Sequence, residues 1–144
     1  MTRRDPQKWD PRFMAVARLV ATWSKDPNKQ VGAVLVSPDG YHVAWGYNGF
    51  PEGFPDDVVM ERSAKNRYML HAEDNAIGRA RQDVTGWHLY VTDPPCLDCA
   101  LAIHRAGISK VVTPPLDPES NWHQSHLEAE GFLTQMGVEQ WRMG

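Results

Sequence analysis

Residues 31–47 read VGAVLVSPDGYHVAWGY, and this stretch decides the fold of the chain. Val31 to Val36 is a short run rich in β-branched residues, which predicts a buried strand. Ser37-Pro38-Asp39-Gly40 predicts a hairpin turn, because Asp-Gly supplies the positive φ that such turns require. Tyr41 to Tyr47 is therefore expected to pair back as a second, antiparallel strand.

Helical and strand patterns alternate on both sides of this hairpin. Upstream, Asp10-Pro11 predicts a helix start, with Asp10 as N-cap and Pro11 in the first helical position, and the helix should end near Ser24. Downstream, an irregular loop is expected over 48–66, followed by helices over 71–81, 96–106 and 121–136 and strands over 87–92, 110–113 and 138–141. The order α-β-β-α-β-α-β-α-β predicts an α/β protein with three α/β/α layers, in which a mixed five-stranded sheet contains one hairpin followed by parallel crossovers.

Length and composition limit the class of protein. The 144 residues are 42% hydrophobic, which fits a single domain over 1–144. The formal net charge of -3 offers no general basic field, so nucleic acid is not the expected partner. The charged start Met1–Pro6 does not resemble a signal peptide, and no apolar run reaches the ~20 residues of a membrane span, so a cytoplasmic protein with no membrane partner is expected.

The motifs His71-Ala72-Glu73 and Pro95-Cys96-Leu97-Asp98-Cys99 indicate a metal site. Two cysteines three positions apart in the first turn of a helix project from one face, where the helix dipole favours the thiolate that zinc needs. One imidazole and two thiolates are three protein ligands, which leaves a fourth position for water, as in catalytic zinc sites. We therefore expect His71, Cys96 and Cys99 to hold one catalytic Zn²⁺, which lowers the pKa of its water.

Glu73 supplies the acid/base group that such a site requires. It lies two residues from His71, so it points to another helical face and is free to move protons as the catalytic residue. The pattern H-x-E…P-C-x-x-C is the signature of zinc deaminases. A structural zinc with a fourth ligand such as His88 or His104 leaves Glu73 unexplained, and a redox pair of cysteines leaves His71 without a role.

With these motifs in place, residues 13–141 resemble the cytidine and deoxycytidylate deaminase family, and most of all its deoxycytidylate (dCMP) deaminases. The segments that carry the resemblance are 24–28 (SKDPN), 31–33 (VGA), 46–51 (GYNGFP) with Gly53, 71–77 (HAEDNAI), 90–92 (YVT), 96–100 (CLDCA) and 106–108 (AGI). The resemblance implies a cytidine-deaminase-like fold, hydrolysis of dCMP to dUMP and ammonia in dTTP precursor supply, and a homo-oligomer, with a hexamer suspected. A related activity on 5-methyl- or 5-hydroxymethyl-dCMP, or on another nucleoside or nucleobase, stays open.

The resemblance also implies roles for residues that contact the substrate. Asn48 is expected to bind the sugar or base, and the backbone amide of Ala72 the pyrimidine O2. The loop that contains Thr92 and Pro94 is expected to accept a hydrogen bond from the leaving amine. Candidates for the phosphate contact are Ser24, Lys25 and Lys29, although solvated loop lysines are an equal alternative for the last two.

A second loop has a regulatory interpretation. Members of the family use a segment like this one to bind dCTP or dTTP effectors between subunits; the matching residues are Gly46, Tyr47, Gly49, Pro51 and Gly53. Mg²⁺ would accompany such a triphosphate, and Asp56-Asp57 is the candidate ligand, with a solvated turn favoured over it. A plain connecting loop is the alternative for the whole segment.

The chain departs from its relatives after the fourth strand, where it reads Leu116-Asp117, so one substrate contact is in doubt there. Asn121-Trp122-His123 is the candidate replacement, although a packing role is favoured for Trp122. His123 and His126 are expected to form a partly exposed pair, in preference to a second metal site.

Overall fold

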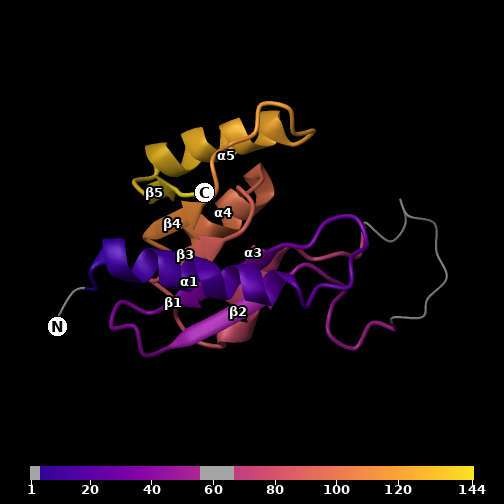
Figure 1. Cartoon of the computed structure of the whole chain (residues 1–144), viewed down its shortest axis with the longest axis horizontal. Helices are drawn as coiled ribbons and strands as arrows, with labels where there is room; N and C mark the ends of the chain where they lie inside the picture. Colours follow the sequence, from indigo (N-terminus) through magenta and orange to yellow (C-terminus); the bar gives the residue numbers. More distant parts are fainter. Residues whose placement is uncertain (1–3, 56–66) are drawn as a thin grey trace.

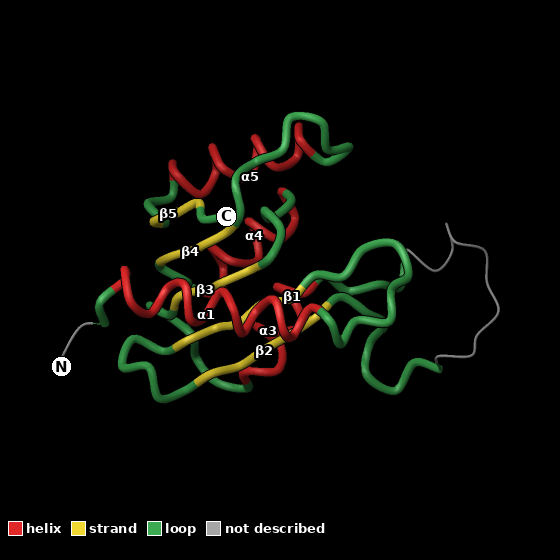
Figure 2. Tube along the Cα trace, viewed as in Figure 1, coloured by secondary structure: helices red, strands yellow, loops and turns green. Residues whose placement is uncertain are grey.

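The computed structural model describes residues 4–55 and 67–144, and its elements follow the predicted order (Figures 1 and 2). The helices are α1 (Pro6–Ala21), α3 (Ala72–Ala80), α4 (Leu97–Ala106) and α5 (His123–Gln135). The strands are β1 (Gly32–Val36), β2 (Val43–Tyr47), β3 (His88–Val91), β4 (Lys110–Thr113) and β5 (Glu139–Arg142). They form a five-stranded sheet in the order β2-β1-β3-β4-β5.

The sheet is mixed, as predicted. β1 pairs antiparallel with β2 across the Asp39-Gly40 turn, where Gly40 has a φ of 82°. β1 also pairs antiparallel with β3, while β3–β4 and β4–β5 are parallel. The parallel pairs require crossovers, which α4 and α5 provide. The carboxyl end of β3 and the start of α4 are thus joined by the short loop that contains Pro95 and Cys96.

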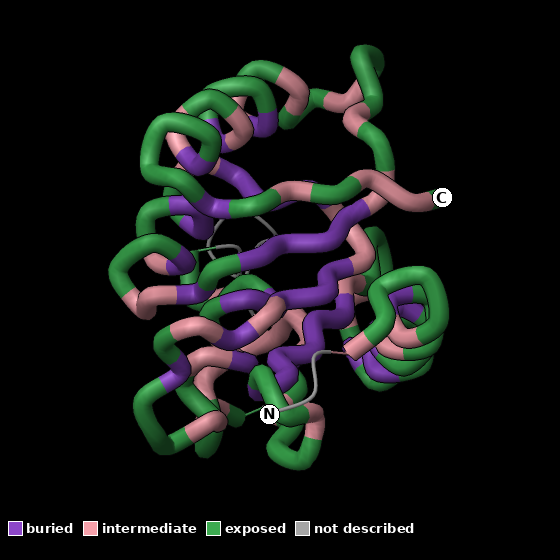
Figure 3. Tube along the Cα trace, turned by 90° about the vertical axis from the view of Figure 1, so that its left-hand side faces the viewer, coloured by how far each residue is buried: buried purple, intermediate pink, exposed green. Residues whose placement is uncertain are grey.

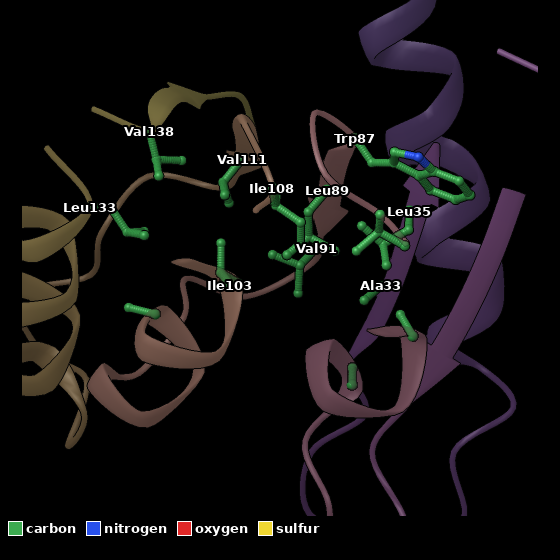
Figure 4. Close-up of a cluster of buried hydrophobic side chains, with 14 of the residues drawn as sticks. Ala33, Leu35, Trp87, Leu89, Val91, Ile103, Ile108, Val111, Leu133 and Val138 are labelled. Atoms are coloured by element: carbon green, nitrogen blue, oxygen red, sulfur yellow. The ribbon is translucent and has the colours of Figure 1, made fainter. Parts of the chain in front are cut away.

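Alternating side chains of the sheet face two different helical layers. Ala33, Leu35 and Leu89 point toward α3, α4 and α5, where they join the larger buried cluster (Figure 4). Val34, Val36 and Tyr90 point the other way and pack against Met14, Ala17 and Val20 of α1. Figure 3 shows the buried strands between these layers. The predicted α/β/α architecture is therefore confirmed.

The first helix begins earlier than expected. Asp5 is the N-cap, its side chain accepts a hydrogen bond from Gln7 N at 3.1 Å, and Pro6 takes the first helical position. Asp5-Pro6 and Asp10-Pro11 carry the same start signal, and the earlier one operates. Pro11 then lies inside the helix, which also ends at Ala21, before Ser24. The predicted start at Asp10-Pro11 is therefore wrong, because tertiary packing outweighs the cost of a proline within the helix.

Asp10 belongs instead to a buried polar group between α1 and the sheet. Its carboxylate accepts a hydrogen bond from Tyr90 Oη at 2.6 Å and pairs with Lys110 Nζ at 2.7 Å. The side chains of Asp10 and Lys110 are only 7% and 5% exposed. The hydrogen bond and the burial raise the pKa of Tyr90, burial being the larger cause. The Asp10 carboxylate on α1 and the Lys110 ammonium on β4 compensate each other's buried charge. This group therefore holds α1 on the sheet.

Gly46 sets the distance between β2 and α3. A Cβ atom at this position would lie 2.3 Å from Ala76 N and 2.6 Å from Ala72 O, both backbone atoms of α3. The absence of a side chain therefore lets the helix that begins after His71 lie directly on the strand. This is a structural role for a residue that the sequence placed in a regulatory loop.

Two further expectations concern the loop and the membrane. The candidate magnesium ligands Asp56 and Asp57, with part of the predicted loop, lie outside the described residues. Within the ranges that the structure describes, no helix has the length and apolar character needed to cross a bilayer.

Removing the carboxylate of Asp10 should destabilise the fold strongly. Asp10→Ala leaves the Lys110 ammonium buried without its partner, which costs about 3–5 kcal/mol. The matched control is Glu130→Ala at the Glu130–Arg142 pair, where Glu130 is 43% exposed and the cost should be about 1 kcal/mol or less. Urea denaturation of both variants gives the two free energies. Equal losses would contradict the role given to Asp10.

Gly46→Ala should destabilise the protein by roughly 1–3 kcal/mol or more, because the added methyl group meets the α3 backbone. Gly78 lies in the same helix, and a Cβ there has no neighbour within 4 Å. Gly78→Ala should therefore stabilise by up to about 1 kcal/mol through helix propensity. Thermal unfolding of the two variants distinguishes the effect of the close approach at Gly46 from the effect of helix propensity at Gly78. A neutral Gly46→Ala would show that β2 and α3 are free to move apart.

Candidate metal centre and active site

Two helix starts meet beside the carboxyl end of β3. His71 is the N-cap of α3 and Cys96 is the N-cap of α4, both with extended backbone and neither with a side-chain capping hydrogen bond. Cys99 follows one turn later in α4. The three predicted ligands thus lie at the positive ends of two helix dipoles, which favour negatively charged groups.

The ligand atoms of His71, Cys96 and Cys99 all lie within 4.8 Å of one another. His71 Nδ1 is 3.2 Å from Cys99 Sγ and 3.5 Å from Cys96 Sγ. Cys96 and Cys99 are buried, while His71 is exposed. Among the described residues, no other His, Cys, Asp or Glu joins the group at this spacing. His88 and His104, the alternative fourth ligands, instead contact Arg4 and Phe132.

The protonation of the cluster suits a cation. Hydrogen bonding from Cys99, and then from His71, lowers the pKa of Cys96 to about 4 against the effect of burial. The hydrogen bond with Cys96 raises the pKa of His71 to about 9. The hydrogen bond to Cys96 also raises the pKa of the Cys99 thiol, and burial adds to this. Shared protons therefore hold these three donors together, and a bound metal ion would take the place of those protons.

The donor set fits zinc. One imidazole nitrogen and two sulfurs are ligands that Zn²⁺ prefers, and tetrahedral coordination leaves one position for a water or a substrate atom. The three atoms are close enough to share one ion, and two belong to the first turn of one helix. The arrangement supports the predicted catalytic site over a closed structural one.

Glu73 lies in the first turn of α3, buried to 4% exposure. No hydrogen bond from another residue to its carboxylate is found within the described ranges. Burial raises the pKa of Glu73 to about 7, against the lowering effect of His71. A carboxyl group that gains and loses its proton near neutral pH can act as both base and acid. Its position beside the cluster, outside the ligand set, agrees with the predicted proton relay.

The loops that contain Ser24 and Asn48 are joined to each other. Asn48 Oδ1 accepts from Val31 N and Nδ2 donates to Lys29 O, both at 2.8 Å. Ser24 Oγ donates to Asn48 O at 2.8 Å, and Ser24 is buried. The side chain of Asn48 therefore holds the start of β1, and each of its polar atoms keeps capacity for one further hydrogen bond. The substrate contacts expected of these two residues stay predictions.

The other predicted contacts lie around the cluster. Ala72 is the first residue of α3, where a helical N–H lacks a partner within the helix. Thr92 Oγ1 accepts from Gly32 N at 3.0 Å, which anchors the loop after β3 to β1. Pro94 is buried in the same loop, between Thr92 and Cys96. The structure thus brings these residues to the ends of the strands, next to the cluster.

A cavity of about 650 Å³ is lined in part by Asn48. Its lining contains four of the predicted effector residues, Tyr47, Gly49, Pro51 and Gly53, together with Lys25. Gly46 is absent from the lining because it packs on α3, and the three candidate metal ligands are absent as well. The cavity and the metal cluster are therefore separate features.

The sequence profile described as "Cytidine and deoxycytidylate deaminase zinc-binding region" matches residues 7–114. The chain belongs to the cytidine and deoxycytidylate deaminase family. A deaminase from the luxG 3′ region of Aliivibrio fischeri is 42% identical over 135 residues, which is 92% of this chain and 91% of the relative. Human deoxycytidylate deaminase is 46% identical over 118 residues, which is 76% of this chain and 66% of the human protein.

Solved structures of the family agree with the fold. The dCMP deaminase of cyanophage S-TIM5, crystallised with dCMP and dUMP, has a TM-score of 0.79 and 30% identity to this chain. The alignment covers 97% of this chain and 99% of the phage protein. A zinc-binding region in the family description and a His/Cys/Cys cluster in the structure both fit Zn²⁺.

Two sets of polar residues in this deaminase were not predicted. Asn75 Nδ2 donates to Tyr47 O at 2.7 Å, and the Arg79 guanidinium lies 5.2 Å from the Tyr47 ring centre. Both residues line the cavity, and their spacing of four on α3 was the available signal. The second set is the ion pair of Lys29 with Asp93, at 3.1 Å, which no local pattern indicates.

Two interpretations need correction. Trp122 is 52% exposed, with its ring centre 6.3 Å from that of His71 and nearly perpendicular to it, so it is not a packing residue. His126 is buried and is therefore not part of a partly exposed pair. His126 is buried because α5 begins against the first turn of α4, where Ser125 Oγ accepts a hydrogen bond from Leu97 N.

Purified wild-type protein should contain one zinc ion per chain, and Cys99→Ala should lose it because two protein ligands hold zinc too weakly. The matched control is Asp98→Asn in the same helical turn, which should retain zinc. Metal content measured by mass spectrometry after dialysis checks both. Full zinc occupancy in Cys99→Ala would rule out the proposed ligand set.

Proposed function

We propose that this protein is a zinc-dependent hydrolase that converts dCMP to dUMP and ammonia. The observation that carries the proposal is the buried Glu73 carboxyl, with its raised pKa, beside the His71, Cys96 and Cys99 cluster. Similarity to human deoxycytidylate deaminase and to the phage enzyme crystallised with dCMP and dUMP supports this substrate.

The reaction replaces the C4 amine of cytosine with an oxygen from water. When bound at the cluster, zinc acts as a Lewis acid that makes the attacking water more acidic. Glu73 accepts the proton of that water and delivers a proton to N3 of the ring. It then takes the proton of the hydroxyl group that is now on C4 and transfers it to the amine, which leaves as ammonia while C4 becomes a carbonyl. A carboxyl with a pKa near neutrality can perform both directions of transfer.

The other residues bind and orient the nucleotide. The Ala72 amide, free within its helix, suits the pyrimidine O2, and the backbone of Thr92 and Pro94 suits the leaving amine. Asn48 is held rigidly by two hydrogen bonds and presents its remaining capacity to the sugar or base. Ser24 belongs to the adjoining loop, whereas Lys25 in that loop lines the separate cavity.

The cavity beside Tyr47 suits a regulatory nucleotide. Lys25 and Arg79 supply cationic groups for phosphates, and Phe50 and Phe54 supply stacked rings for a base, with ring centres 4.7 Å apart. We propose dCTP or dTTP as the ligand, with Mg²⁺ on its phosphates. A homo-oligomer, with a hexamer suspected, and a cytoplasmic location are part of the same proposal.

A substrate panel tests the activity. Ammonia release should be fastest with dCMP among dCMP, 5-methyl-dCMP, 5-hydroxymethyl-dCMP, deoxycytidine and a transfer RNA. Glu73→Gln should retain zinc and lose turnover by about 10²–10⁴-fold or more, because the amide cannot relay protons.

The matched control for this variant is Asp74→Asn, the next residue of the same helical turn, which should keep most of the activity. Preference for a 5-substituted dCMP would change the substrate and leave the mechanism intact. Full activity of Glu73→Gln would overturn the mechanism.

A further inference from the structure

The amino-terminal turn of α5, residues 122–126, lies against the metal-binding turn of α4. The Ser125 hydroxyl accepts a hydrogen bond from Leu97 N at 2.9 Å, so a residue of α5 satisfies the first helical amide of α4. The turn has no side-chain cap of its own and no acidic residue in its first turn. The start of α5 is therefore fixed next to Cys96 and Cys99, with its positive dipole end toward them.

Two histidines in this turn have unused hydrogen-bonding groups. Nδ1 of His123 and Nδ1 of His126 are both buried, and neither has a hydrogen-bond partner in the part of the chain that the structure describes. His126 as a whole is 4% exposed. Nδ1 is therefore the ring nitrogen of each histidine that is left without a hydrogen bond among the described residues. A buried polar side chain without a protein partner points to a partner outside the chain.

The charges around His126 belong to the candidate active site. Burial lowers the pKa of His126, and the further contributions come from Asp93, Lys29, Cys96 and His123. The ring is thus neutral near pH 7, and one of its nitrogens is available as a donor. Lys29 pairs with Asp93 at 3.1 Å but is 53% exposed, so its ammonium can move to a new anion.

Trp122 connects this turn to the catalytic cluster. Its half-exposed ring lies perpendicular to that of His71, with centres 6.3 Å apart. The residues of the turn therefore extend from a candidate metal ligand outward to Lys29. When the base of a substrate binds at the cluster, an anionic group on the same substrate would lie near this turn.

We propose that the amino-terminal turn of α5 binds the phosphate of the substrate nucleotide, with His123 and His126 as donors and Lys29 as the charged partner. This inference rests on the proposed function and adds two histidines to Lys29, which the loop sequence already suggested for the phosphate. Helix starts favour phosphate through their free N–H groups and dipole. In the absence of substrate, Asp93 keeps the Lys29 ammonium beside the turn.

Steady-state kinetics with dCMP and with deoxycytidine tests the assignment. His126→Ala should raise KM for dCMP about ten- to a hundredfold, the loss of a hydrogen bond to a charged group, and leave kcat/KM for deoxycytidine unchanged. His126→Asn, whose amide nitrogen lies near the position of Nδ1, should recover part of the loss. The matched control is His42→Ala, an exposed histidine before β2, which should have no effect on either substrate.

Lys29→Gln keeps the inference testable if His126→Ala fails to fold, because Lys29 is exposed. It should weaken inhibition by dUMP about tenfold or more and leave inhibition by deoxyuridine unchanged. Equal losses for phosphorylated and unphosphorylated ligands, or no loss in either variant, would overturn the inference. A wild-type enzyme that deaminates other substrates but not dCMP would instead refute the proposed function, so the two failures are distinguishable.

Discussion

The structure depends on the meeting of two helix starts at one end of the sheet. His71 and Cys96 are both N-cap residues, and neither side chain is used to cap its own helix. Their donor atoms are free to converge with Cys99 because α3 lies close on β2, at Gly46, and α4 follows directly from β3. Helix starts also favour the thiolate form of cysteine, so the position that unites these residues also prepares them for a cation.

The same end of the sheet concentrates ionisable groups whose pKa values are shifted. The hydrogen bond between Cys96 and His71 lowers the pKa of the thiol and raises the pKa of the imidazole. The Glu73 carboxyl is buried, and its pKa is raised to about 7. Buried groups with shifted pKa values gather at functional sites, since catalysis needs protonation states that water would not support. The His126 imidazole of the α5 turn is buried and has a lowered pKa, and it follows this pattern with a different purpose, the capture of an anion.

On the opposite face of the sheet, a buried polar group stabilises the scaffold that holds the site. There, Asp10, Lys110 and Tyr90 form a closed polar group under α1, in which every charge has a partner. A satisfied buried pair orders the scaffold, whereas the buried Glu73 carboxyl, with its raised pKa, is suited to proton transfer. The family relationship extends over this scaffold as well, because the phage enzyme aligns with 97% of the chain.

The sequence by itself determined the order of the elements, the hairpin at Asp39-Gly40, and the His71, Cys96, Cys99 and Glu73 set, because these depend on local periodicity, turn chemistry and fixed spacing. It misplaced the start of α1, since Asp5-Pro6 and Asp10-Pro11 carry the same signal and only the buried partners of Asp10 distinguish them. Only the tertiary structure decided that Gly46 is a contact with α3, that Lys29 meets Asp93, and that Trp122 and His126 lie beside the cluster. These relations join residues far apart in the chain, whose proximity is fixed by the register of the sheet and the packing of helices on it.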